Sequence, residues 1–259
     1  MKKTFEVGIV QLNYNKKVRN IIKDIKKYMK IAKGRGVDIL CFPESSLDLG
    51  HKRNRALIKE LREECRKNSI WCILVGHLLE NKYVSNSAFL IDSNGKIAGR
   101  HRKVHPCESH PIKRGTVFEV YDTPFCKIGL AICWDVTFPD AIYKMAKHGV
   151  DLVFCPMYWV YDEWAHKKDH IKHEKKILES LVLARAYENI VYVAFCNAYD
   201  SSDKTLVSYS AIAEPHKILG EIFAKEGLIT ATVDLNYLSM IRGRYRREYN
   251  KKFWRAKHL

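Results

Sequence analysis

The sequence contains eight cysteines but no pair at the Cys-x-x-Cys spacing. That spacing is typical of zinc ribbons and of thioredoxin-like redox pairs, so its absence argues against both classes. Several cysteines, such as Cys41, Cys155 and Cys196, lie inside apolar runs, where a thiol behaves as a small buried hydrophobic group. We therefore expect most of the thiols to be unreactive and the compartment to be reducing.

Long apolar runs are also missing. No segment approaches the roughly 18 uninterrupted apolar residues that a membrane-spanning helix needs. The first residues, Met1 to Gly8, pass directly into a strand-like pattern, without the apolar stretch and small-residue cleavage site of a secretory signal. We expect a soluble, cytoplasmic protein with no membrane partner.

No segment rich in Pro, Gly or Ser divides the 259 residues, of which 47% are hydrophobic. Strand-like and helix-like patterns alternate, so we expect one α/β domain over residues 1–259, with a basic tail over residues 242–259. The expected helices cover residues 18–33, 54–68, 139–148 and 170–188. The expected strands cover residues 5–12, 37–42, 70–76, 84–91, 96–102, 117–121, 127–132, 150–155, 190–196, 206–213, 218–223 and 228–233.

The formal net charge of +16 raises the question of nucleic-acid binding. The densest basic run, residues 242–257, mixes basic and aromatic residues as RNA-binding segments often do. The alternative is a tail whose aromatic rings pack on the protein or on a partner subunit while its charges stay in solvent. No RNP, KH or zinc-knuckle pattern accompanies the charge, so we favour this second interpretation.

Three segments place a chemically capable side chain at the end of an expected strand, where sheet-based enzymes assemble their sites. These side chains are Glu44, Lys103 and Cys133. A thiol attacks carbon as the thiolate, and a helix N-terminus together with a nearby cation lowers the pKa of a thiol. We expect the helix that begins near Pro139 and the Lys103 ammonium to act on Cys133 in this way. The Glu44 carboxylate would take the thiol proton and later activate water.

Together, these segments resemble the nitrilase superfamily of carbon–nitrogen hydrolases. The resemblance rests on Phe-Pro-Glu44, Arg-Lys103-Val-His and Ile-Cys133-Trp-Asp-x-x-Phe-Pro, which occur in that order. It extends over nearly the whole chain, through the segments 8–12, 185–197, 208–215 and 231–234.

The resemblance implies a role for each matching residue. Glu44 would be the general base, Cys133 the nucleophile, and Lys103 the cation that stabilises the tetrahedral intermediate. The backbone N–H of Trp134 would share the oxyanion with Lys103. The family's second glutamate stands seven residues before a glycine, and Glu108 has that position here.

The resemblance also implies a fold and an assembly. We expect a four-layer α-β-β-α sandwich that pairs into homodimers, or higher homo-oligomers, through helices near the cysteine strand. We expect no cofactor.

Aromatic residues follow the strand after the nucleophile, and two interpretations of them stay open. Tyr158 and Trp159 either pack at the edge of the sheet or, with Trp134, line an apolar substrate pocket. His166, His170 and His173 have the spacing of metal ligands. The lysines around them oppose a divalent cation, so we expect no metal.

Three functions stay open. The leading one is hydrolysis of a small amide or N-carbamoyl substrate through a cysteine thioester, which releases ammonia or an amine. The second is conversion of a nitrile to a carboxylic acid through the same thioester. The third is a non-catalytic, basic nucleic-acid-binding protein, and the intact Glu–Lys–Cys set argues against it.

We predict that nucleic acid binds weakly, without sequence preference, and is released at physiological salt, because binding driven by phosphate contacts weakens steeply with salt. Fluorescence polarisation of labelled RNA and DNA across a salt series measures this. Tight, sequence-selective binding at physiological salt would contradict the prediction.

Overall fold

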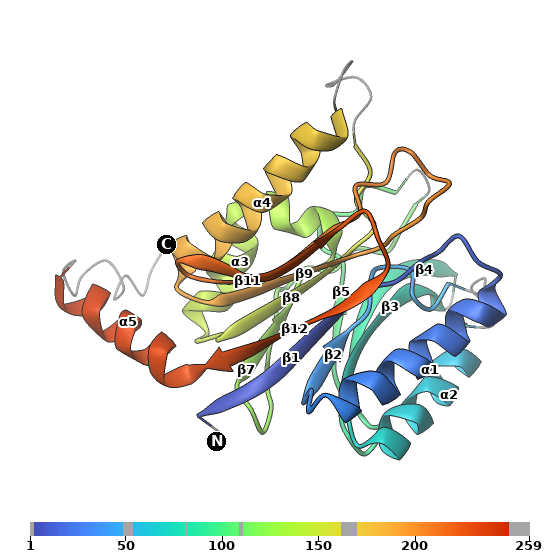
Figure 1. Cartoon of the computed structure of the whole chain (residues 1–259), viewed down its shortest axis with the longest axis horizontal. Helices are drawn as coiled ribbons and strands as arrows, with labels where there is room; N and C mark the ends of the chain where they lie inside the picture. Colours follow the sequence, from blue (N-terminus) through green and yellow to red (C-terminus); the bar gives the residue numbers. More distant parts are fainter. Residues whose placement is uncertain (1–2, 49–53, 81, 109–110, 162–169, 249–259) are drawn as a thin grey trace.

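The computed structural model describes residues 3–48, 54–80, 82–108, 111–161 and 170–248. These residues form two six-stranded mixed sheets that pack face to face, with α1 and α2 on the outer face of one sheet and α3 and α4 on the outer face of the other (Figure 1). The expected four-layer α-β-β-α sandwich is therefore confirmed. The helices are α1 (Val18–Gly34), α2 (Asn54–Asn68), α3 (Pro139–Lys147), α4 (His170–Asn189) and α5 (Leu235–Glu248), with a short 3-10 helix, η1 (Cys133–Thr137).

The first sheet has the strand order β12-β1-β2-β3-β4-β5, and the second has the order β11-β10-β9-β8-β7-β6. Strands β1, β2 and β3 run parallel, as do β7, β8 and β9, and helices make the crossovers between them. The strands of the first sheet are β1 (Thr4–Gln11), β2 (Ile39–Cys41), β3 (Trp71–Glu80), β4 (Tyr83–Ile91), β5 (Ile97–Arg102) and β12 (Gly227–Asp234). Those of the second are β6 (Val120–Asp122), β7 (Lys127–Leu130), β8 (Leu152–Met157), β9 (Tyr192–Asn197), β10 (Tyr209–Glu214) and β11 (Lys217–Phe223).

Two hydrophobic clusters fill the space between the layers: one lies between the sheets and continues beneath α3 and α4, and the other lies beneath α1 and α2. The alternation of side chains along each strand assigns residues to them. On β1, Val7 and Ile9 point into the core between the sheets. Val10, on the opposite face, packs in the core beneath α1 and α2. Because β1 and β3 are buried on both faces, they are apolar along most of their length.

The sequence pattern predicts no helix after residue 233 and assigns residues 242–259 to a basic tail. The structure instead has helix α5 over Leu235–Glu248. Leu238 and Ile241 are buried against the core, and Arg242 joins α5 to the second sheet. The Arg242 guanidinium donates to the Ile190 carbonyl oxygen at 3.0 Å and to an Asp151 carboxylate oxygen at 2.6 Å. Residues 242–248 are therefore part of a packed helix. Of the tail's aromatic residues, Tyr245 is half-buried and packs against the core of this chain, whereas Tyr249, Phe253 and Trp254 lie outside the described residues.

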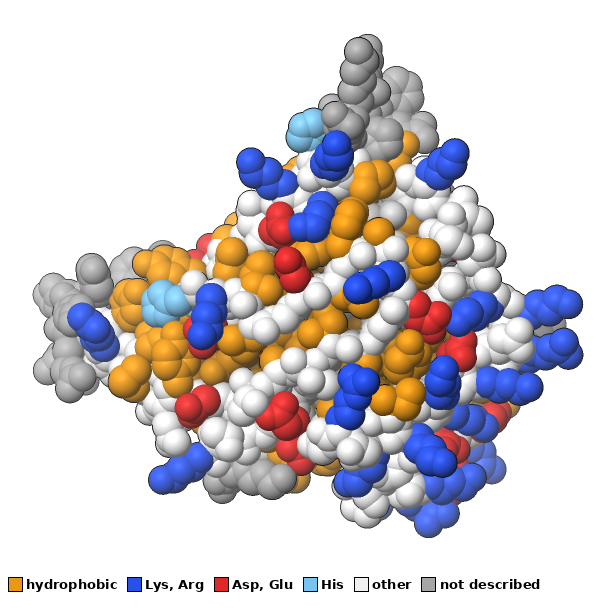
Figure 2. Space-filling model, viewed as in Figure 1, with side chains coloured by type: hydrophobic (Ala, Val, Ile, Leu, Met, Phe, Trp, Pro, Cys, Tyr) orange, Lys and Arg blue, Asp and Glu red, His pale blue; other side chains and the backbone are white. Residues whose placement is uncertain are grey.

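The basic excess is unevenly spread over the surface. In the view of Figure 2, Lys and Arg side chains gather over α1 and α2, and hydrophobic side chains are more frequent toward β11 and α5. On α1, the lysines at 23, 27, 30 and 33 are exposed, while Ile25, Met29 and Ala32 form its buried stripe. No helix among the described residues is long and apolar enough to span a membrane.

Candidate active site

The three residues predicted to be catalytic come from different strand ends and meet in one place. Glu44 follows β2 by three residues, Lys103 follows β5 directly, and Cys133 begins η1 after β7. All three are nearly inaccessible to solvent: Glu44 and Cys133 are each 4% exposed and Lys103 is 1% exposed. The first two belong to one sheet and Cys133 to the other, so the site lies where the two sheets meet.

The Lys103 ammonium is enclosed by acidic groups. Its Nζ lies 3.0 Å from Glu44 Oε1, 3.2 Å from Glu108 Oε1 and 3.7 Å from Cys107 Sγ. Burial alone would lower the pKa of Lys103, but the charges of Glu44 and Glu108 outweigh it and hold that pKa above its usual range. Lys103 is therefore a fixed cation, available to stabilise negative charge that develops beside it.

The Glu44 carboxylate is held at both of its oxygens. Oε1 accepts from Lys103 and from Asn86 Nδ2 at 2.7 Å, and Oε2 accepts from the backbone N–H of Tyr158 at 2.9 Å. The Glu44 carbonyl oxygen also accepts from the Tyr14 hydroxyl at 2.7 Å. These contacts fix both the backbone and the side chain of Glu44, as the position of a general base requires.

Cys133 is strained and buried. Its φ is +47°, in the left-handed region that residues other than glycine seldom adopt. Burial raises the pKa of the Cys133 thiol, the Glu44 carboxylate raises it further, and the Lys103 ammonium only partly opposes them. Our expectation of a lowered thiol pKa is therefore wrong, because loss of solvation outweighs the nearby cation. The Cys133 thiol is therefore held in its protonated form.

Asp135 ties the lysine segment to the cysteine turn, and its role was not predicted. Its carboxylate accepts from the backbone N–H groups of Ile132 at 3.0 Å and of His105 at 2.7 Å, and it also contacts the His101 ring at 3.2 Å. Burial alone would raise the pKa of Asp135, but these hydrogen bonds, the His101 contact foremost, lower it. One buried carboxylate thus fixes the backbone at His105, two residues after Lys103, and at Ile132, directly before Cys133.

Glu108 lies beside Lys103, as its predicted role as the second glutamate requires. Asn86 Nδ2 donates to Glu108 Oε1 at 2.8 Å as well as to Glu44. Asn86 was not predicted, although it stands in a run of buried polar residues on β4 with Ser85 and Ser87. Such a run inside an otherwise apolar strand is a signal from which this site residue could have been found.

The three aromatic residues weighed as substrate contacts lie close to Cys133. The Cys133 Sγ donates weakly to the Tyr158 carbonyl oxygen at 3.8 Å, and the rings of Trp134 and Trp159 lie 5.4 Å apart. Trp159 is 4% exposed, and its indole N–H donates to Glu174 on α4 at 3.1 Å. Trp134 is 41% exposed, so its ring faces solvent next to Cys133.

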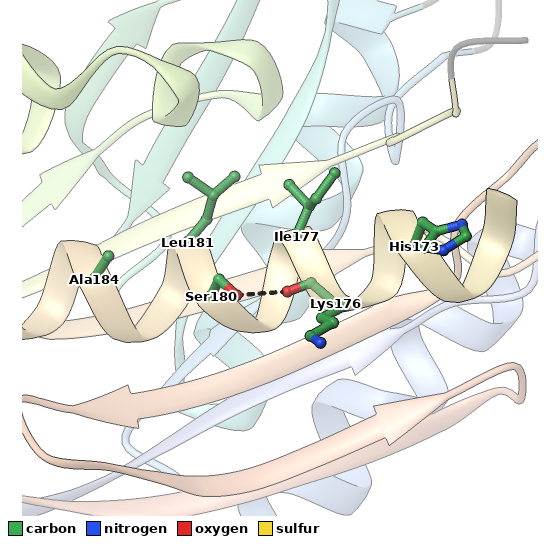
Figure 3. Close-up of a pocket in the computed structure, with 6 residues that line it drawn as sticks. All are labelled: His173, Lys176, Ile177, Ser180, Leu181 and Ala184. Carbon is green, nitrogen blue, oxygen red and sulfur yellow. Dashed lines mark hydrogen bonds between the residues drawn. The ribbon is translucent and has the colours of Figure 1, made fainter. Parts of the chain in front are cut away.

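The histidines weighed as metal ligands do not form a site in the described part of the chain. His173 lies on the exposed face of α4 and borders a shallow, mostly apolar hollow (Figure 3). The other lining residues are Lys176, Ile177, Ser180, Leu181 and Ala184. His166 and the side chain of His170 lie outside the described residues. No group of three His, Cys, Asp or Glu side chains suited to a metal occurs among the residues that are described.

Known proteins share the sequence family and the fold of this chain. The profile of the carbon-nitrogen hydrolase family matches residues 6–242. A probable nitrilase of Schizosaccharomyces pombe is 31% identical over 176 residues, 64% of this chain and 59% of that protein. The 2-oxoglutaramate amidase of Bacillus subtilis is 26% identical over 259 residues, 93% of this chain and 95% of that protein. The crystal structure of an amidase from Nesterenkonia sp. has the same fold, with a TM-score of 0.78 and 21% identity over 96% of this chain and 98% of that one.

We predict that Asp135→Asn lowers the free energy of unfolding by about 3 kcal/mol, because an amide cannot replace the carboxylate that several buried donors share. Urea denaturation measures the change. The matched control is Asp140→Asn on α3, an exposed carboxylate paired with Lys144, which should change stability by less than about 1 kcal/mol. Equal effects of the two substitutions would contradict the organising role of Asp135.

Proposed function

The chain belongs to the carbon–nitrogen hydrolase family, and we propose that it hydrolyses small amides or N-carbamoyl compounds through a thioester on Cys133. The contacts of Lys103 carry this proposal. A permanently charged ammonium, nearly excluded from water, stands beside a fixed carboxylate and within electrostatic reach of a thiol on a strained turn. Such a set can generate a nucleophile and stabilise an oxyanion.

The first half-reaction forms the acyl-enzyme. Glu44 takes the proton of the Cys133 thiol as Sγ attacks the carbonyl carbon. The carbonyl oxygen becomes an oxyanion, which the Lys103 ammonium and the backbone N–H of Trp134 stabilise. The carbon–nitrogen bond then breaks, and protonated Glu44 gives its proton to the leaving nitrogen, which departs as ammonia or an amine. The high pKa of the thiol supports this order, because it ties deprotonation to the attack.

The second half-reaction releases the acid. Glu44, again a carboxylate, removes a proton from water, and the hydroxide oxygen attacks the thioester carbon. The second tetrahedral intermediate uses the same oxyanion contacts, and its collapse breaks the carbon–sulfur bond and restores the thiol with the proton held by Glu44. Glu108 keeps the Lys103 ammonium in place throughout, a role supported by their 3.2 Å contact.

The aromatic residues supply the walls of the substrate site in this proposal. Trp134 is exposed beside the nucleophile, and its contact with Trp159 supports an apolar surface there. The rings of Tyr14 and Tyr158 stack 6.0 Å apart, and both residues donate hydrogen bonds to Glu44. Walls of this kind favour a substrate with an aliphatic or aromatic body.

The choice of amides over nitriles is supported by the amidase from Bacillus subtilis, which aligns over nearly the whole chain. The alignment with the probable nitrilase covers less of both proteins. A nitrile would form the same Cys133 thioester after hydration of a thioimidate, so substrates must be compared directly.

The proposal extends to assembly and location. The exposed face of α4, with Ile177, Leu181 and Ala184 around the hollow of Figure 3, supports a homodimer formed through this helix. All eight cysteines are free thiols, which supports the reducing cytoplasm as the place of action.

We predict that wild-type protein releases ammonia from members of a panel of ω-amides and N-carbamoyl amines, and that Cys133→Ala abolishes release without loss of folding. Glu44→Gln and Lys103→Met should each lower kcat by about 100-fold or more, on the scale of losing a base or an oxyanion donor. Cys126→Ala is the matched control, a buried thiol away from these contacts. Activity only on nitriles, or activity that survives Cys133→Ala, would refute the proposal.

We predict that Ile177→Glu converts the protein to a monomer, because a carboxylate would be buried without a partner if the α4 face is the dimer contact. Analytical ultracentrifugation measures the mass. The control Met240→Glu, which changes a still more exposed apolar residue on α5, should leave the mass of wild type. A wild-type monomer, or a dimer unaffected by Ile177→Glu, would contradict this part of the proposal.

A further inference from the structure

A second cationic group lies beside Glu108 and approaches the same carboxylate oxygen, Oε1, that Lys103 contacts. His77 is on β3, and its side chain is 15% exposed. Its Nδ1 lies 2.8 Å from Asp48 Oδ2, and its backbone N–H donates to Asp48 Oδ1, also at 2.8 Å. Its Nε2 lies 3.7 Å from Glu108 Oε1. The imidazole thus stands between two carboxylates, one at each ring nitrogen.

This geometry determines the charge of His77. Because Asp48 accepts at Nδ1, that nitrogen carries a proton. In a neutral ring, Nε2 would then turn its lone pair toward the Glu108 carboxylate, which is repulsive, so the imidazolium is favoured. Burial alone would lower the pKa of His77, but the hydrogen bond with Asp48 and the nearby Glu108 carboxylate outweigh it and raise that pKa to about 10.

The imidazolium also explains how two carboxylates can share one lysine. Glu44 and Glu108 both accept from Asn86 and both contact Lys103. With Lys103 as their only cation, the pair would carry an excess negative charge beside a cysteine that must ionise. His77 supplies a second positive charge at Glu108, while Asp48 balances it at the other ring nitrogen, so the imidazolium offsets the excess only locally, at Glu108. Burial would raise the pKa of Glu108, yet the contact with His77, followed by the charge of Lys103, lowers it.

We infer that the Asp48–His77 pair positions Glu108, and through Glu108 the Lys103 ammonium, during the hydrolysis proposed above, on which this inference rests. Asp48 fixes the orientation and charge of the ring, and the ring lies against the Glu108 oxygen that also contacts Lys103. Among the hydrogen bonds of the described residues, none joins Asp48 or His77 to Cys133 or to Glu44. Both therefore act as positioning residues.

The charged groups that face His77 among the described residues are Asp48, Glu108 and Glu44, with Lys103 beyond Glu108. Its neighbour across the β3–β4 ladder is neutral Asn86. The pKa of His77 is raised above its usual 6.5, so the stability that its charge contributes is complete below pH 6.5 and is lost as pH rises through about 10. In the wild-type protein, His77 therefore stays protonated beside Glu108 throughout the neutral pH range.

Asp48→Asn is the sharpest substitution, because it keeps the shape of the side chain and removes the charge that holds His77 protonated. We expect kcat to fall by about tenfold to 100-fold at pH 8, with KM nearly unchanged. We also expect a new loss of activity as pH rises from 6 to 8. His77→Gln should show the lower kcat at every pH, without the additional loss of activity between pH 6 and 8. The double variant Asp48→Asn/His77→Gln should have the same kcat and pH profile as His77→Gln. The control His216→Gln, which changes an exposed histidine beside α5, should keep the wild-type profile.

Two readouts do not depend on the substrate. The NMR signals of the His77 ring, assigned by their loss in His77→Gln, should show the imidazolium at pH 8 in wild type and the neutral ring in Asp48→Asn. Alkylation of Cys133 by iodoacetamide, followed by mass spectrometry, should slow in both variants but not in His216→Gln.

The outcomes separate the two proposals. A neutral His77 at pH 8 in wild type, or variants with wild-type kcat, pH profile and alkylation rate, would overturn the positioning role even if amides are hydrolysed. If no amide or carbamoyl substrate is turned over, but His77 is an imidazolium and Cys133 alkylation depends on it, the substrate class is wrong and the positioning role stands.

Discussion

Burial of the Lys103 ammonium is the constraint on which the rest of the site depends. A cation at 1% exposure is tolerated only where negative charge and hydrogen-bond acceptors surround it. Glu44 and Glu108 supply that charge, but they follow strands β2 and β5, which β3 and β4 separate in the sheet. Their side chains therefore meet over the two middle strands, which must offer polar groups there, and Asn86 and His77 are those groups.

The thiol and the lysine belong to different sheets, so the packing of the sheets sets the geometry of the site. The core between the sheets fixes their separation, and Asp135 then links the turn after β7 to the segment after β5 through buried hydrogen bonds. The strained φ of Cys133 is held by the same contacts, since the Ile132 N–H just before it is bound to Asp135. The buried contacts that join the two sheets therefore also fix the position of the Cys133 thiol.

The chemistry that follows is governed by desolvation. Excluding water raises the pKa of the Cys133 thiol and strengthens every charge around it. A free thiolate is disfavoured, but an oxyanion that forms beside Lys103 is stabilised without competition from solvent. A site of this kind favours proton transfer coupled to attack over a preformed nucleophile.

The sequence by itself determined the order of strands and helices, the family and the three strand-end residues Glu44, Lys103 and Cys133, because local periodicity and short motifs carry that information. Strand β1, for example, was predicted over residues 5–12 and is observed at Thr4–Gln11. Helix α5 was missed because its basic residues hide the apolar positions Leu238 and Ile241. Only the tertiary structure decided that Asn86, Asp135 and His77 join the site, since each acts through partners 22 to 42 residues away along the chain. It also decided that the thiol pKa is raised, because burial is a property of the packed sheets and of no single segment.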